Sequence, residues 1–112
     1  MTRKRKVEVQ IKREIVEIFQ KKIQDDRIGF ISFTDVTISK DFSYAKVFYS
    51  QIGTEKQKAK TNERLLAITG LVKFELGKIL RLRTVPDIKF VFDKSLEVGV
   101  DLVNKINALK DQ

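Results

Sequence analysis

The feature that most constrains this chain is a change of hydrophobic pattern between Leu65 and Ser95. Apolar residues first recur at helical spacing, are interrupted at Thr69-Gly70, and resume at helical spacing from Leu71. The only proline, Pro86, follows. A proline drives the preceding residue out of the helical region, and a run of strand-forming residues begins just after it. The stretch therefore predicts two helices joined at a short break and followed by a strand.

Thr69 and Gly70 define the predicted break. A threonine hydroxyl can accept from the first N–H groups of a helix, so Thr69 is a candidate N-cap of the second helix. Gly70 carries no side chain and lets another backbone approach closely. Because a helix N-terminus beside basic side chains attracts phosphates, the break predicts a nucleic-acid contact rather than an enzyme pocket.

The remaining elements follow from hydrophobic periodicity. A helix is predicted to start at Thr54, where Gln57 completes a capping box, and a last helix is predicted after Ser95. The other predicted elements are a first helix over 5–24 and strands over 28–39, 44–52 and 88–92. The short turn between the first two strands favours antiparallel pairing. This order predicts one α+β domain over residues 1–112, with its helices on one face of a three-stranded sheet.

Composition narrows the possible functions. The chain has 23 Lys and Arg against 15 Asp and Glu, a net charge of +8, which favours an acidic partner such as nucleic acid or an anionic membrane surface. It has no cysteine and no histidine, which removes thiolate nucleophiles, histidine bases and the usual zinc ligand sets. No apolar run is long enough to cross a membrane, so we expect a soluble cytoplasmic protein without cofactor, metal or membrane partner.

Several other residues could in principle carry chemistry. Asp25, Asp26 and Asp41 could do acid–base work, but they fall at a helix end and in a turn, where carboxylates usually act as solvated caps. Gly77-Lys78 resembles part of a phosphate-binding loop, but its spacing from Gly70 is wrong and no Ser or Thr follows the lysine. A helix-turn-helix would also join two helices at a break, but this chain is too rich in strand.

Two basic clusters are the candidate phosphate contacts. Lys78, Arg81 and Arg83 come at the end of the helical pattern, and alternation around Leu82 can bury the leucine while both arginines face outward. The second cluster is either a nucleic-acid arm or only a solvated terminus, and it consists of Arg3, Lys4, Arg5 and Lys6.

Aromatic residues are frequent in the predicted strands. Stacking on bases is one role open to them, although we expect most of them to pack in the core. They are Phe30, Phe33, Tyr44, Phe48 and Tyr49, with Phe90 and Phe92 expected on one core-facing side of the last strand.

Together these segments resemble a known family. SFTDVTISKDFSYAKVFYS, the interruption at Thr69-Gly70 and LGKILRLRTVPDIKFVFDKSLEVG are similar to ribosome-binding factor A. REIVEIFQKKIQDDRIGF resembles the amino-terminal helix of that family and its Asp-Arg turn, so the resemblance covers about 7–109. It implies a type II KH-like fold of order α-β-β-α-α-β, followed here by a C-terminal helix. It also implies a non-enzymatic factor that matures the small ribosomal subunit by binding its RNA near the 5′ end and the decoding region.

The resemblance also assigns a candidate site. In this family an interrupted helix with Ala-x-Gly replaces the usual KH glycine loop; here Gly70 matches, and Ile68 stands in place of the alanine. Thr69 and Gly70 would then admit the RNA backbone. The residues expected to contact phosphates are Lys73, Lys78, Arg81 and Arg83, with Arg3, Lys4, Arg5 and Lys6 extending the basic surface.

The partners that the resemblance implies are the small (30S) ribosomal subunit and its 16S rRNA, with a monomeric protein when free. Two alternatives remain open at this point. One is a general KH-type protein that binds single-stranded RNA and has no link to ribosomes. The other is a small phosphate-handling enzyme, which the lack of His, Cys and a proper phosphate loop disfavours.

Overall fold

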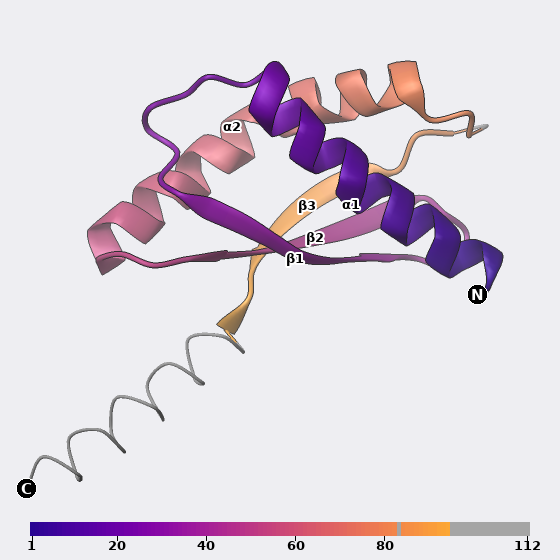
Figure 1. Cartoon of the computed structure of the whole chain (residues 1–112), viewed down its shortest axis with the longest axis horizontal. Coiled ribbons are helices and arrows are strands. Elements are labelled where there is room, and N and C mark those ends of the chain that lie inside the picture. Colours follow the sequence, from indigo (N-terminus) through magenta and orange to yellow (C-terminus); the bar gives the residue numbers. More distant parts are fainter. Residues whose placement is uncertain (83, 95–112) are drawn as a thin grey trace, which may run out of the picture.

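The computed structural model describes residues 1–82 and 84–94 (Figure 1). Its elements are α1 (Arg3–Lys21), β1 (Ile31–Ile38), β2 (Tyr44–Gln51), α2 (Glu55–Ile79) and β3 (Asp87–Phe92). The helix predicted after Ser95 lies outside the described residues.

The three strands form one sheet in the order β1-β2-β3. β1 and β2 pair antiparallel, as the short turn between them predicted, whereas β3 runs parallel to β2. A parallel neighbour needs a crossover connection, which α2 supplies. Figure 1 shows α1 and α2 on the same face of this sheet. The predicted α+β, type II KH-like fold is therefore confirmed, with the change in α2 described below.

The core lies between the two helices and the sheet. α1 contributes Ile11, Ile15 and Ile18 at helical spacing, and each is almost completely buried. β2 buries every second residue, so that its inward face points at the helices and its other face remains more exposed. The buried residues of β2 and α2 that complete this core are Ala45, Val47, Tyr49, Leu65, Val72 and Leu76.

The predicted break at Thr69-Gly70 is wrong, because α2 runs through it as one helix of 25 residues. The Thr69 hydroxyl donates to the Leu65 carbonyl at 2.8 Å, one turn earlier, so Thr69 is not an N-cap. Leu65, Val72 and Leu76 are all buried on one helix face, and this face continues in phase across the glycine. Packing of that face outweighs the roughly 1 kcal/mol by which glycine disfavours a helix relative to alanine.

Capping residues define the helix starts. The hydroxyl of Thr2 accepts from the Arg5 N–H at 3.1 Å, so α1 begins two residues earlier than predicted. The predicted capping box at α2 is confirmed, since Thr54 and Gln57 each accept from the other's backbone N–H.

The edge of β1 is fastened to α1 by charged side chains. Glu8 accepts from the Ile38 N–H at 2.8 Å, and the Lys12 ammonium donates to the Thr34 carbonyl at 3.2 Å. Thr34 has no register partner on β2, so Lys12 satisfies a carbonyl where the ladder is irregular. These bonds protect the outer part of β1 from pairing with other chains.

Candidate nucleic-acid interface

One face of α2 carries a shallow groove of about 480 Å³. Gly70 and Gly77 lie two turns apart on this face and lack side chains, which keeps the floor of the groove low. The side chains around them are Lys73, Phe74, Lys78 and, from the segment before β3, Val85. The structure thus brings together three of the predicted site residues: Gly70, Lys73 and Lys78.

Lys78 is exposed and Lys73 is partly exposed, and both have local partners. The Lys73 ammonium lies 2.6 Å from an Asp87 carboxylate oxygen. The Lys78 ammonium lies 3.4 Å from a Glu75 carboxylate oxygen and 4.5 Å from the centroid of the Phe74 ring. The Lys73–Asp87 pair is exposed at both ends and contributes little to stability, so a phosphate can replace Asp87 at small cost.

The segment after α2 follows the predicted alternation as far as the structure describes it. Leu82 packs against the core, and Arg81 is exposed. The Arg81 guanidinium makes no hydrogen bond or ion pair with any described residue, so it is available to a phosphate. Arg83 lies outside the described residues.

The four basic residues at the start of α1 differ in what they contact. The Arg5 guanidinium donates to Glu8 at 3.3 Å and to Asp35 at 3.2 Å, so its charge is used within the fold. The Arg3 guanidinium lies 5.7 Å from the centroid of the Phe42 ring. Lys4 and Lys6 are exposed, and their ammonium groups form no ion pair among the described residues.

A chain of contacts connects the start of α1 to the groove on α2. Arg3 lies over Phe42, and the next residue, Ser43, accepts at its carbonyl from the Asp87 N–H at 3.0 Å. Asp87 in turn holds Lys73. Figure 1 shows the N-terminus, the β1–β2 turn and the end of α2 at the same end of the molecule. We call this the basic end, and it comprises Arg3, Lys4, Lys6, Lys73, Lys78 and Arg81.

Two of the three carboxylates considered for acid–base chemistry, Asp25 and Asp41, are held by ion pairs or hydrogen bonds. Asp41 accepts from the hydroxyls of Ser43 and Ser39, and these bonds lower the pKa of Asp41 from its ordinary 3.8 to about 2. Arg27, and more weakly Arg64, hold the pKa of Asp25 well below its ordinary value. Such carboxylates stay ionised at neutral pH and are poorly suited to proton transfer.

The described residues hold no group of His, Cys, Asp and Glu that could bind a metal ion. Among the same residues, none of the helices is both long and apolar enough to span a membrane.

Thr69 and Phe74 depart from the predicted site in opposite ways. Thr69 is partly buried and bonded to its own helix, and it does not line the groove. Phe74 is 61% exposed and lines the groove, although it was not among the predicted site residues. An aromatic residue placed four residues after one glycine and three before another was the available signal.

Comparisons with known proteins identify the family. The family model described as ribosome-binding factor A matches residues 3–106. Ribosome-binding factor A of Staphylococcus saprophyticus is 41% identical over 107 residues, which cover 96% of this chain and 90% of the relative.

Solved structures agree with this assignment. The solution NMR structure of a Thermotoga maritima ribosome-binding factor A has a TM-score of 0.69 and 33% identity, covering 83% of this chain and 89% of that one. Thermus thermophilus ribosome-binding factor A, as fitted into the cryo-EM map of a 30S–RbfA complex, has the same fold, with a TM-score of 0.65, 24% identity and coverages of 80% and 93%. The chain belongs to the ribosome-binding factor A family.

Proposed function

We propose that this protein is an assembly factor that binds the small (30S) ribosomal subunit through its 16S rRNA, holds an immature conformation or blocks premature use, and then leaves. The observation that carries the proposal is membership of the ribosome-binding factor A family over residues 3–106. The fitted Thermus thermophilus structure supports it, because that relative belongs to a 30S complex.

The basic end is the proposed contact surface. The two glycines of the groove let a sugar–phosphate backbone come close to α2, while Lys73 and Lys78 exchange their carboxylate partners for phosphates. Arg81 adds a guanidinium that is suited to bidentate phosphate binding. Arg3, Lys4 and Lys6 widen the positive surface on the neighbouring part of the same end.

The proposed role requires binding and release, and no bond has to be made or broken. Cations and a smooth helix face are sufficient for it, so we propose that the protein acts without catalysis. We propose that it acts as a monomer in the cytoplasm, where its RNA partner is assembled.

Fractionation of a cell extract on a density gradient tests the proposal. The protein should sediment with small subunits and be absent from mature 70S ribosomes. Added bulk single-stranded RNA should compete poorly for the subunit-bound fraction. Release of the protein by an equal mass of unrelated RNA would instead identify a general RNA-binding protein.

A further inference from the structure

The end of the molecule opposite the basic end exposes two large apolar side chains. Phe30 is 97% exposed and Ile52 is 95% exposed. Ile31 pairs with Gln51 at the end of the β1–β2 ladder, so Phe30 and Ile52 occupy neighbouring positions just beyond it. Phe30 was predicted to lie inside a strand over 28–39, where most aromatic residues were expected in the core. The structure begins β1 at Ile31, so Phe30 lies just before the strand. Large side chains left in water at one place often mark a binding surface.

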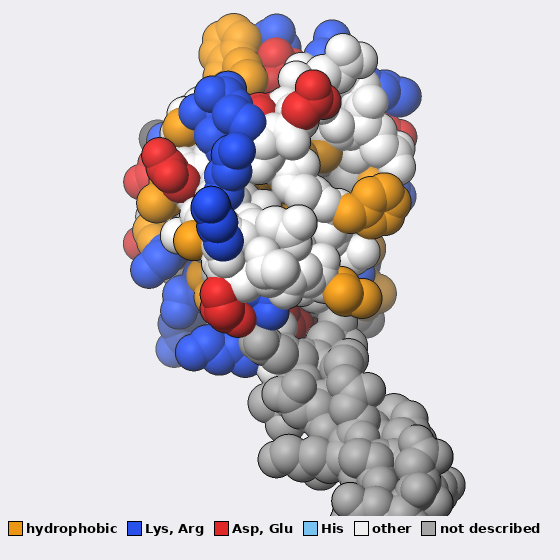
Figure 2. Space-filling view, turned by 90° about the vertical axis from the view of Figure 1, so that its left-hand side faces the viewer, with side chains coloured by type: hydrophobic (Ala, Val, Ile, Leu, Met, Phe, Trp, Pro, Cys, Tyr) orange, Lys and Arg blue, Asp and Glu red, His pale blue; other side chains and the backbone are white. Residues whose placement is uncertain are grey.

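Basic residues lie beside this apolar pair. Lys56 and Lys60 are exposed on the first turns of α2, and neither makes an ion pair with a described residue. The Gly29 N–H donates to the Thr61 hydroxyl at 3.1 Å, which fastens the residue before Phe30 to the residue after Lys60. Figure 2, which faces this end, shows Lys and Arg side chains running down it between exposed hydrophobic side chains.

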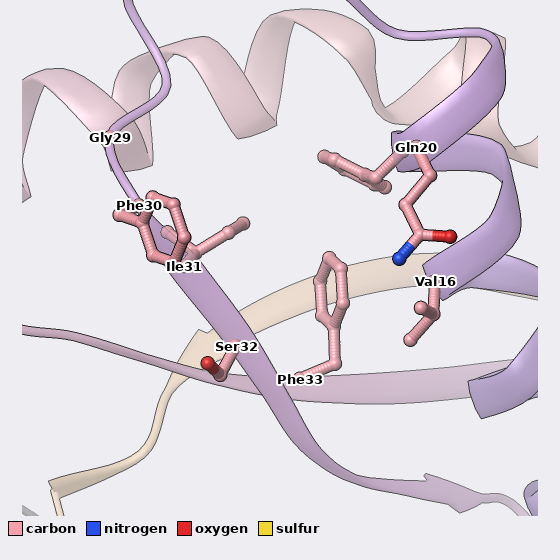
Figure 3. A pocket seen from close by; sticks show the side chains of 8 residues that line it. Val16, Gln20, Gly29, Phe30, Ile31, Ser32 and Phe33 are labelled. Atoms are coloured by element: carbon pink, nitrogen blue, oxygen red, sulfur yellow. The ribbon is translucent and has the colours of Figure 1, made fainter.

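A cavity of about 500 Å³ opens next to Phe30, between α1 and the start of β1. Its walls are largely apolar, with Val16 and Phe19 from α1 and Phe33 from β1. Gln20 and Ser32 add polar groups that can hydrogen-bond. Figure 3 shows Gln20 and Val16 approaching from α1 while Phe30 stands at the Gly29 end. Apolar walls with a few polar groups suit a flat heteroaromatic ring.

We propose that this end binds single-stranded RNA, with one unpaired base stacked on Phe30 and seated at the mouth of the cavity. Lys56 and Lys60 would hold the phosphates on either side of that nucleotide. The combination of an exposed aromatic ring and neighbouring cations is the usual means of holding single strands. Because these lysines lack partners among the described residues and the chain carries +8, RNA fits this end better than an apolar protein surface does.

This inference rests on the proposed function and adds a second contact to it. At a rise of about 1.5 Å per residue, Lys56 and Lys78 lie roughly 33 Å apart along α2. The stacking site is therefore separate from the groove of the basic end. It would read an unpaired nucleotide, whereas the groove would hold backbone phosphates.

The test uses a short single-stranded oligoribonucleotide that carries 2-aminopurine, whose fluorescence falls when it stacks on an aromatic ring. Phe30→Ala should weaken binding roughly 5- to 150-fold and abolish the quenching, since stacking contributes about 1–3 kcal/mol per base. Phe30→Trp should retain both. Leu66→Ala removes another exposed apolar side chain, on α2, and should bind like the parent. Circular dichroism should show all three variants folded, because both positions are exposed.

Binding of each protein to purified small subunits separates this inference from the proposed function. If the parent does not bind subunits, the proposed function fails, and the stacking site still stands on the oligonucleotide result. If the parent binds subunits and Phe30→Ala binds and quenches the oligonucleotide like the parent, the stacking site is overturned. It is also overturned if Phe30→Ala loses subunit affinity without losing oligonucleotide affinity, because this end then docks on a ribosomal protein.

Discussion

At the scale of single residues, the two glycines of α2 have different surroundings although both lie in the groove. A Cβ atom at Gly70 would meet nothing within 4 Å, whereas one at Gly77 would lie 3.2 Å from a methyl carbon of Val85. Neither has a positive φ. Gly70 therefore keeps the groove shallow and does not mark a break in the helix, whereas Gly77 is a close-packing site against Val85.

Gly70→Ala should stabilise the protein by up to about 1 kcal/mol, because alanine favours a helix and open space receives its methyl group. Gly70→Val should melt close to the parent but bind small subunits more weakly, since its branched side chain narrows the groove. Gly77→Ala should gain less than Gly70→Ala, because Val85 must move. Thermal melts and subunit titrations measure these effects. A Gly70→Val protein that melts far below the parent would show that the backbone there is not ordinary helix.

Asp25 provides a second test at this scale. The Arg27 and Arg64 guanidinium groups lie 3.0 and 2.9 Å from its carboxylate oxygens and hold its pKa down. A lowered carboxyl pKa contributes stability that is complete above the ordinary value of 3.8 and is lost as the pH falls towards the folded value.

We therefore expect Asp25→Asn to be less stable than the parent by a constant amount above the ordinary carboxyl pKa of 3.8, and by a progressively smaller amount as the pH falls below that value. Urea melts between pH 2 and pH 7 check this, with the exposed neighbour Asp26→Asn as the control. A constant difference between Asp25→Asn and the parent across that range would mean that the ion pairs are not what Asp25 contributes.

At the scale of elements, the sequence predicted correctly those features that depend on interactions between residues close in the chain. The capping box at Thr54 and the antiparallel hairpin depend on residues close in sequence, and both are confirmed. The break at Thr69-Gly70 was wrongly predicted because Thr-Gly is typical of a helix boundary, and the first helix ends at Lys21, three residues before its predicted end. Only the packed face through Leu65 and Val72 shows that the helix continues.

Thr54→Ala should destabilise the protein by about 1 kcal/mol, because it removes both the hydroxyl and the reciprocal bond of the capping box. Asn62→Ala, at an exposed position inside α2, should be neutral or stabilising. Chemical denaturation of both variants separates the effect of a cap from a general effect on the helix. Equal melting of Thr54→Ala and the parent would mean that the first turn of α2 does not contribute to stability.

At the scale of the whole molecule, the fold assembles a basic end that no local pattern contains. Gly70, Lys73 and Lys78 could be grouped from their helical spacing alone. The pairing of Arg5 with Asp35, 30 residues away, could not be predicted in this way, because it depends on how α1 crosses β1. The approach of the N-terminus to α2 likewise depends on β3 lying beside β2.

The central claim, that the basic end binds rRNA phosphates, is tested by titrating small-subunit binding against salt. Each neutralised phosphate contributes a slope of about −0.7 to −0.9 in log K against log salt, so Lys78→Gln with Arg81→Gln should make the slope shallower by about 1.4 to 1.8. The control variant is Lys46→Gln with Lys89→Gln. These two exposed lysines lie side by side on β2 and β3, on the face of the sheet away from the helices, so removing the same charge there should leave the slope unchanged. Equal slopes for the parent and the Lys78/Arg81 variant would contradict the account.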